Sequence, residues 1–163
     1  MSADSKFRLL AAFRHIGQNV NLSTFSDRLV FQKQVYLLQE LGLKLGYSYG
    51  WYRRGPYSRD AASDGFQLEN IQNEMETLPE LTENEIRAAT ILQELIVESR
   101  ERFETDDTTY SMELLGSLHF LLTHGYPRPA SAEEALRRFN ELKPNFIEDA
   151  NSALELLTEK NLI

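Results

Sequence analysis

The chain has 163 residues, of which 42% are hydrophobic and 26% charged, and it contains no cysteine. This composition is typical of a globular domain and excludes disulfides, thiolate metal sites and cysteine nucleophiles. The formal net charge of −8 argues against a uniformly basic nucleic-acid binder. However, residues 1–60 hold nine basic and four acidic side chains, whereas residues 61–163 hold eight and 21, which leaves room for a local basic surface.

In the N-terminal half, apolar periodicity predicts helices over residues 5–16 and 25–41. The second helix has apolar side chains on nearly every side, which is typical of a central helix that packs on several faces. Residues 46–54 are rich in aromatic side chains at alternate positions and favour a short strand or hairpin arm. Gly55-Pro56 predicts a turn, and Ser58 is suited to cap a following helix.

In the C-terminal half, two capping-box patterns, Thr82 to Glu85 and Ser131 to Glu134, each predict a helix start. The apolar pattern predicts helices over 86–103 and 112–123, a short one reaching Leu142, and a last one that Pro144 opens. We therefore expect a mainly α fold: a compact bundle of six or seven helices around the central helix 25–41, with a short β element near 46–54. The chain reads as a single helical domain over 1–163, with the helices of 131–163 as a candidate subdomain.

The N-terminal residues contain no apolar run of the kind that a signal peptide has. The longest apolar stretch, residues 114–122, is much shorter than the ~20 residues that cross a bilayer. These two observations predict a cytoplasmic protein with no membrane association.

Motifs of catalysis are weak in this sequence. Residues 46–50 match G-x-S-x-G, but no helical pattern follows the serine, as a nucleophile elbow requires. His119 and His124 are five residues apart, so they do not share a helical face as metal ligands at i and i+4 do. Nucleotide-binding glycine motifs are absent. We therefore predict no catalytic residues, no cofactor and no metal site, and we expect His119 to be a hydrogen-bonded interior or boundary residue.

The densest group of side chains able to bind a partner lies between residues 47 and 60. Tyrosine, tryptophan and arginine dominate protein–protein hot spots, and the same side chains can stack on bases and hold phosphates. A third interpretation is structural: an aromatic strand packs on the core while its arginines pair with the acidic C-terminal part. We predict a protein-binding surface made of Trp51, Tyr52, Arg53, Arg54, Tyr57 and Arg59.

The same region resembles a known family. The sequence Gln32-Lys33-Gln34-Val35-Tyr36-Leu37-Leu38-Gln39 is similar to the "Q-K-x-x-Y-L-x-Q" helix of the YwgA-like proteins of archaea and bacteria. Residues 51–58 resemble their "W-Y-x-x-G-P-Y-S" turn, and Leu142-Lys143-Pro144 followed by Phe146 resembles their "L-K-P-x-F" junction. Those proteins resemble in turn the SocA/Panacea superfamily.

The resemblance implies a compact helical domain with a small β element, and it supplies no catalytic residues. Some Panacea-type proteins are antitoxins that bind a partner protein directly, so the resemblance makes a toxin one candidate partner. We expect the motif residues Gln32, Lys33, Tyr36, Gly55, Pro56 and Ser58 to have a structural role, with a buried Gln32 bonding to the backbone of the aromatic strand. A nucleic-acid-binding transcriptional regulator is the first alternative function, and a metal-dependent hydrolase is the second.

Overall fold

The structure, a computed structural model, describes residues 3–163. Along this part of the chain it contains α1 (Ala3–His15), α2 (Phe25–Leu41), β1 (Gly50–Tyr52), β2 (Gly55–Tyr57), α3 (Arg59–Ile71), η1 (Gln72–Glu74), α4 (Glu83–Arg102), α5 (Thr108–His124), α6 (Ala132–Leu142), η2 (Pro144–Phe146) and α7 (Ala150–Glu159). The mainly α fold class with a small β element is confirmed. Met1 and Ser2, which belong to the segment on which the expectation of no signal peptide rests, lie outside the described residues.

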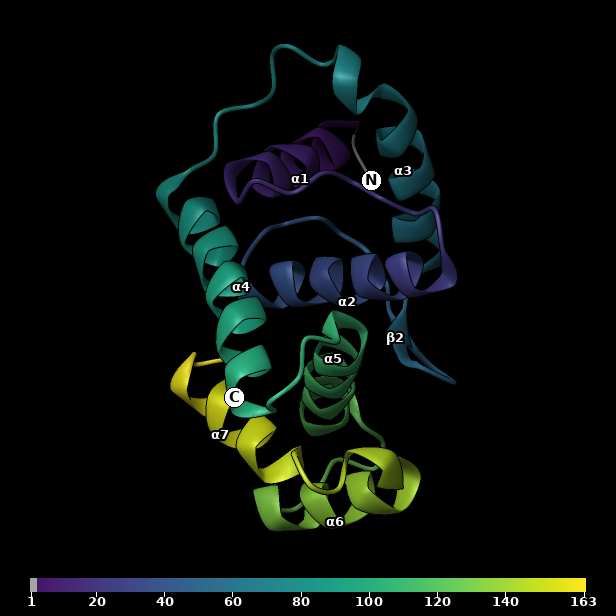
Figure 1. The fold of residues 1–163 in the computed structure, drawn as a ribbon, viewed down its shortest axis with the longest axis vertical. Helices are drawn as coiled ribbons and strands as arrows, with labels where there is room; N and C mark the ends of the chain where they lie inside the picture. Colours follow the sequence, from purple (N-terminus) through teal and green to yellow (C-terminus); the bar gives the residue numbers. More distant parts are fainter. Residues whose placement is uncertain (1–2) are drawn as a thin grey trace.

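Helix α2 runs through the middle of the molecule, as its apolar circumference predicts. Thr24 caps its start in a reciprocal capping box with Asp27, and Gly42, with a φ of +124°, ends it. Figure 1 shows α1 and α3 on one side of α2, α5 on the other, and α4 along its C-terminal end. One end of α2 differs from the prediction, because the Phe25 side chain is 58% exposed rather than packed in the core.

Helix α5 is a second central helix, which the sequence did not distinguish from the others. Every residue from Ser111 to Leu121 is buried, and the helix packs on α2, α4, α6 and α7. Polar side chains are among those that it buries, including Glu113 and His119. Because buried polar groups need hydrogen-bond partners, Glu113 and His119 bond to residues far away in the sequence.

The β element is a hairpin whose turn lies earlier than predicted. Strands β1 and β2 are antiparallel, with Tyr52 opposite Gly55 and Trp51 opposite Pro56, so the loop consists of Arg53 and Arg54. The prediction of a turn at Gly55-Pro56 is therefore wrong: these residues form the second strand. Gly55 has a φ of +99°, as in hairpins where a glycine follows a type I turn, and this backbone requirement explains the glycine.

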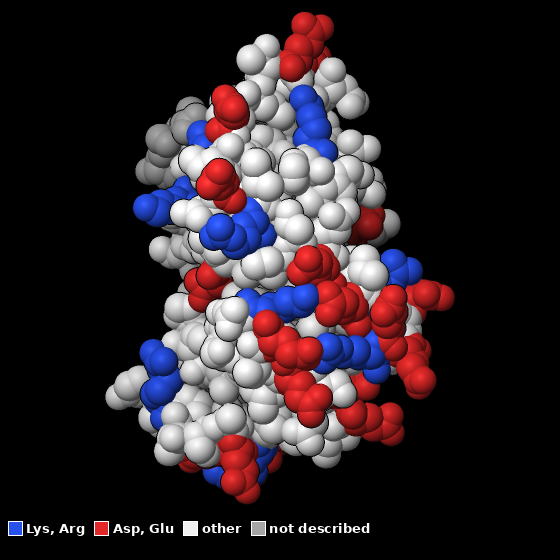
Figure 2. Space-filling view, turned by 90° about the vertical axis from the view of Figure 1, so that its left-hand side faces the viewer, with Lys and Arg blue, Asp and Glu red and all other residues white. Residues whose placement is uncertain are grey.

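Charged side chains are distributed unevenly over the surface. Figure 2 shows acidic side chains gathered, with basic ones between them, over the face that carries α4 and α7. There, Lys160 pairs with Glu94 and Glu98, and Arg102 pairs with Glu159. Some acidic residues of the C-terminal part thus pair with basic residues of the same part, although residues 61–163 hold 21 acidic and only eight basic side chains. No helix among residues 3–163 has the length and apolar character needed to cross a membrane.

Candidate functional site

The hairpin is fixed to α2 by two buried side chains that bind its backbone. The Gln32 side-chain amide donates from Nε2 to the Ser58 carbonyl at 2.9 Å and accepts at Oε1 from the Ser58 N–H at 3.0 Å. The neighbouring Lys33 donates from Nζ to the Pro56 carbonyl at 2.7 Å. Gln32 is buried and bonds to backbone, as expected, but its partner is Ser58, which directly follows β2, and not the aromatic strand of residues 46–54. Ser58 also caps α3, since its Oγ accepts from the Ala61 N–H.

The other end of the segment is held in the same way, two helical turns farther along α2. Gln39 donates from Nε2 to the Tyr47 carbonyl and accepts at Oε1 from the Tyr47 N–H, both at 2.9 Å. Between the two glutamines, the Tyr36 ring packs edge-on against Tyr49, with centroids 5.1 Å apart. One face of α2 therefore holds residues 47–58, and it consists of Gln32, Lys33, Tyr36 and Gln39.

A third attachment comes from the junction between α6 and η2. Lys143 donates from Nζ to the Arg53 carbonyl in the hairpin loop at 3.1 Å, and it pairs with Glu113 Oε2 at 3.0 Å. The other oxygen of Glu113 accepts from Arg54 Nη1, also at 3.0 Å. Glu113 is buried, so this carboxylate ties the hairpin to α5 from the interior.

The cluster around the buried carboxylate of Glu113 holds more positive than negative charge; Lys33 and Lys143 are buried in it, whereas the Arg54 side chain is 51% exposed. Lys33, Arg54 and Lys143 lie near one carboxylate, that of Glu113. The pKa of Lys33 is lowered to about 7, chiefly by burial; the charge of Glu113 opposes this shift, and the charges of Lys143 and Arg54 add to it. An uncompensated buried cation is unfavourable, so the site favours either a neutral Lys33 or an additional anion.

The two faces of the hairpin carry different side chains, because successive residues of a strand point to opposite sides. On one face, Trp51 packs on Phe120 with ring centroids 5.9 Å apart, and Lys143 Nζ lies 5.7 Å from the centre of the indole ring. On the other face, the rings of Tyr52 and Tyr57 meet edge-on at 5.2 Å. Trp51 remains 39% exposed and Tyr52 52% exposed, so each face presents an aromatic side chain to solvent.

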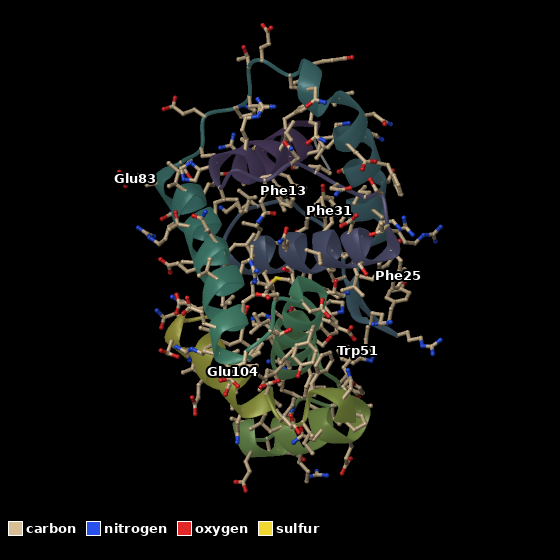
Figure 3. The ribbon with its side chains drawn as sticks, viewed as in Figure 1. Phe13, Phe25, Phe31, Trp51, Glu83 and Glu104 are labelled. Atoms are coloured by element: carbon tan, nitrogen blue, oxygen red, sulfur yellow. The ribbon has the colours of Figure 1, made fainter. Side chains whose placement is uncertain are left out.

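The Tyr52–Tyr57 face borders a groove of about 760 Å³ between α2, the hairpin and α3. We call it the α2–α3 groove. Phe25, from the start of α2, and Phe66, from α3, contribute half-exposed rings, and the Arg54 guanidinium lies 5.6 Å from the centre of the Phe25 ring. Figure 3 shows Phe25 at the outer end of α2 and Phe31 on the interior side of the same helix. The lining consists of Leu22, Phe25, Arg28, Leu29, Phe31, Gln32, Lys33, Tyr52, Arg53, Arg54, Gly55, Tyr57, Ala62 and Phe66.

The six residues predicted to bind a partner do not form one continuous patch. Tyr52, Arg53, Arg54 and Tyr57 meet at the groove, while Trp51 lies on the opposite face of the hairpin. Arg59, exposed at the start of α3, makes no ion pair within residues 3–163, and neither does the Arg53 side chain. The structural interpretation expects all three arginines to pair with the acidic part of the chain. Of the three, only Arg54 does so, with Glu113.

Several residues of this region escaped the sequence analysis. Phe25, Arg28 and Phe66 look like ordinary members of amphipathic helices, and only the packing shows that their side chains meet in one groove. Glu113 lies in a leucine-rich helix, where an isolated carboxylate is itself a signal that could have been used, because buried charges require partners. Lys143 was part of the quoted family motif, yet its contact with the hairpin spans 90 residues of sequence.

A second polar cluster joins α2 to the C-terminal end of the chain. His119, buried as expected, hydrogen-bonds at Nε2 to the Leu162 carbonyl at 3.0 Å and at Nδ1 to the Tyr36 hydroxyl at 2.7 Å. Because a carbonyl only accepts, Nε2 carries the proton and Nδ1 accepts from Tyr36. Burial lowers the pKa of His119, in keeping with a neutral ring. Across residues 3–163, no three side chains of His, Asp or Glu are grouped so that they could hold a metal ion.

Comparison with protein-family models, with curated proteins and with solved structures finds no match to this chain. The resemblance to the YwgA-like proteins therefore stays a prediction from the quoted motifs. The hairpin and the α2–α3 groove are therefore the features of the molecule that bear on its function.

Proposed function

We propose that this chain is a non-enzymatic protein-binding domain that holds its partner through the hairpin of residues 50–57. The observation that carries the proposal is the contrast between a firmly held backbone and exposed side chains. Buried Gln32, Lys33 and Lys143 fix the hairpin backbone, while Tyr52 and the Arg53 side chain extend into solvent. Such an arrangement supports binding, because little side-chain and loop entropy is lost when a preorganised surface meets its partner.

The types of exposed side chain support a protein partner. Tyrosine, tryptophan and arginine supply large, rigid contacts and several hydrogen-bond donors, and they are the residues most enriched at protein–protein hot spots. The resemblance to Panacea-type proteins makes a toxin the first partner class to test. The alternative, a nucleic-acid-binding regulator, has the aromatic and arginine side chains in its favour, but acidic side chains outnumber basic ones in the chain as a whole.

The experiment is site-specific photocrosslinking. A photoreactive amino acid replaces Tyr52 in the full chain, expressed in cells, and crosslinked species are identified by mass spectrometry. The matched control carries the same amino acid at Tyr126, whose side chain is 98% exposed and lies in the loop between α5 and α6. We expect one discrete protein crosslinked from position 52 and absent from position 126. Equal crosslinking from both positions, or a nucleic acid captured at position 52, would contradict the proposal.

A further inference from the structure

The α2–α3 groove differs in charge from the rest of the molecule. Its lining contains four basic side chains, the arginines Arg28, Arg53 and Arg54 together with Lys33, and neither aspartate nor glutamate. The chain as a whole has 25 acidic and 17 basic side chains. A groove of the opposite sign on an acidic protein selects for anionic groups, because like charges elsewhere on the surface repel them and the lining attracts them.

The cations of the lining are poorly compensated by the protein itself. Lys33 is buried and its Nζ donates to a carbonyl, that of Pro56, while Arg28 donates to the carbonyl of Leu22 at 3.1 Å. The Arg53 side chain has no ion pair among the described residues, and Arg54 shares Glu113 with Lys143. A carboxylate entering the groove would therefore gain several donors, and it would supply the anion that the buried cluster lacks.

The remaining surface of the groove is apolar and partly open. Phe25 is 58% exposed and Phe66 47% exposed at its edges, with Leu29, Phe31 and Ala62 deeper in the lining. Exposed aromatic side chains that border a concavity are typical of interaction sites, since covering them removes a large apolar area from water. The volume of about 760 Å³ falls within the usual range of roughly 300 to 1,000 Å³ for ligand sites.

We propose that the α2–α3 groove docks a segment of the partner protein in which bulky apolar side chains alternate with aspartate or glutamate. The apolar side chains cover Phe25, Phe66 and the deeper lining, while the carboxylates meet Arg53, Arg28 and the Lys33 end of the groove. This inference rests on the proposed function and assigns its chemistry to one face of the hairpin. The opposite face, with Trp51, is not required for it.

The test uses the full purified chain and a library of random peptides displayed on phage as the probe. Enriched peptides are synthesised, and their affinities are measured for four variants whose substituted side chains are exposed. Arg53→Glu and Phe66→Glu alter the groove. Arg128→Glu and Val97→Glu place the same new charge at an exposed arginine and a half-exposed apolar residue away from it. Circular dichroism and thermal unfolding verify that all four variants remain folded.

We expect enriched peptides that combine aromatic or aliphatic residues with aspartate or glutamate. Each groove variant should weaken their binding at least tenfold, added salt should weaken it as well, and the two control variants should bind like the unaltered chain. Enrichment of peptides without acidic residues, equal affinity for Phe66→Glu, or no enrichment at all overturns the inference. Displacement of the peptides by a single-stranded oligonucleotide also overturns it, in favour of a phosphate-binding groove.

The design separates this inference from the proposed function. A partner captured from position 52 that binds the Phe66→Glu variant normally but fails to bind Trp51→Ala keeps the protein-binding proposal and rejects the groove. Absence of any captured partner, together with acidic apolar peptides that bind in the groove, rejects the hairpin proposal as stated. It then leaves the groove as a peptide site in its own right.

Discussion

Gln32 and Gln39 lie seven residues apart on one face of α2, and each pairs its side-chain amide with the backbone N–H and carbonyl of a single residue, Ser58 and Tyr47 respectively. Seven residues are close to two full helical turns, so the two amides point in the same direction. They hold the two ends of the segment that contains the hairpin. Their hydrogen bonds stabilise this segment in place of the bonds that neighbouring strands would supply in a larger sheet. A two-stranded hairpin by itself is marginally stable, which explains why such side chains are needed here.

Substitution of Gln32 should show how much this pairing contributes. Gln32→Leu leaves the buried N–H of Ser58 without a partner, at a cost of about 1–3 kcal/mol, whereas the Ser58 carbonyl still accepts from the Ala62 N–H. We therefore expect a loss of about 1–3 kcal/mol in the free energy of unfolding, measured by urea denaturation. Gln93→Leu, at an exposed position of α4, is the matched control and should change the stability by less than about 0.5 kcal/mol. Equal effects of the two substitutions would show that the pairing stabilises nothing.

Glu113 provides a test of the buried charge cluster. Glu113→Gln removes the charge that pairs with Arg54 and Lys143 and leaves their positive charges uncompensated. Breaking a buried ion pair in this way costs about 3–5 kcal/mol. The double variant Glu113→Gln/Lys143→Met should be more stable than Glu113→Gln alone, because it removes one of the unpaired charges. A double variant that is less stable by the sum of the two single losses would contradict this account of the cluster.

The folded protein should become more stable above neutral pH because of Lys33. Its pKa is about 7 in the folded state, against 10.5 for an ordinary lysine. Between pH 7 and pH 10.5, Lys33 is therefore protonated in the unfolded chain and mostly neutral in the folded protein. The penalty for burying this side chain is therefore largest below pH 7 and declines as the pH rises towards 10.5. Relative to Lys33→Met, the unaltered protein should gain roughly 2 to 3 kcal/mol between about pH 7 and pH 9.5.

The comparison with Lys33→Met is needed because tyrosines also titrate at high pH. Burial raises the pKa of Tyr36, Tyr47 and Tyr49, so their ionisation in the unfolded chain destabilises both variants equally. The measurement is the free energy of unfolding of both proteins in urea across this pH range. A difference that stays constant with pH would mean that Lys33 keeps its proton in the folded protein and has an ordinary pKa.

Gly55 should be hard to replace for two separable reasons. A Cβ at this position would overlap the Ser117 Oγ of α5, and the φ of +99° is strained for any other residue. We expect Gly55→Ala to cost about 3 kcal/mol. Adding Ser117→Ala removes the overlapping oxygen and should recover about half of that loss, whereas Ser117→Ala alone should cost less than about 1 kcal/mol. Full recovery in the double variant would show that the backbone conformation contributes no strain.

The helices could be predicted from the sequence because their signals are local. The bounds of α2 match the prediction, and the Thr82 and Ser131 caps lie where the capping patterns place them. The last helix is the exception: Pro144 opens a short 3-10 turn, and α7 begins only at Ala150. The turn was misplaced because Gly55-Pro56 is a strong local signal for a reversal, while the real loop is set by pairing between the two strands.

The candidate site was predictable in its residue types but not in its arrangement. The sequence indicates that Tyr, Trp and Arg are concentrated in residues 47–60, but strand alternation then sends Trp51 and Tyr52 to opposite faces. Phe66 joins Tyr52 in the groove because α3 packs on α2. The apolar periodicity of a helix does not indicate which other helix it packs against. Contacts such as that between Lys143 and Arg53 depend on the tertiary fold, so a single sequence gives no measure of them.

The hairpin is held through its main chain: Ser58, Pro56, Arg53 and Tyr47 are all bound at backbone atoms. The side chains of residues 51–53 contribute none of these hydrogen bonds. Chains that keep the same α2 face could therefore exchange the exposed side chains of Tyr52 and Arg53 and acquire new partners without loss of these backbone hydrogen bonds. The residues that maintain the fold of this domain are thus different from the residues that are free to vary, as in an antibody, where a constant framework carries variable loops.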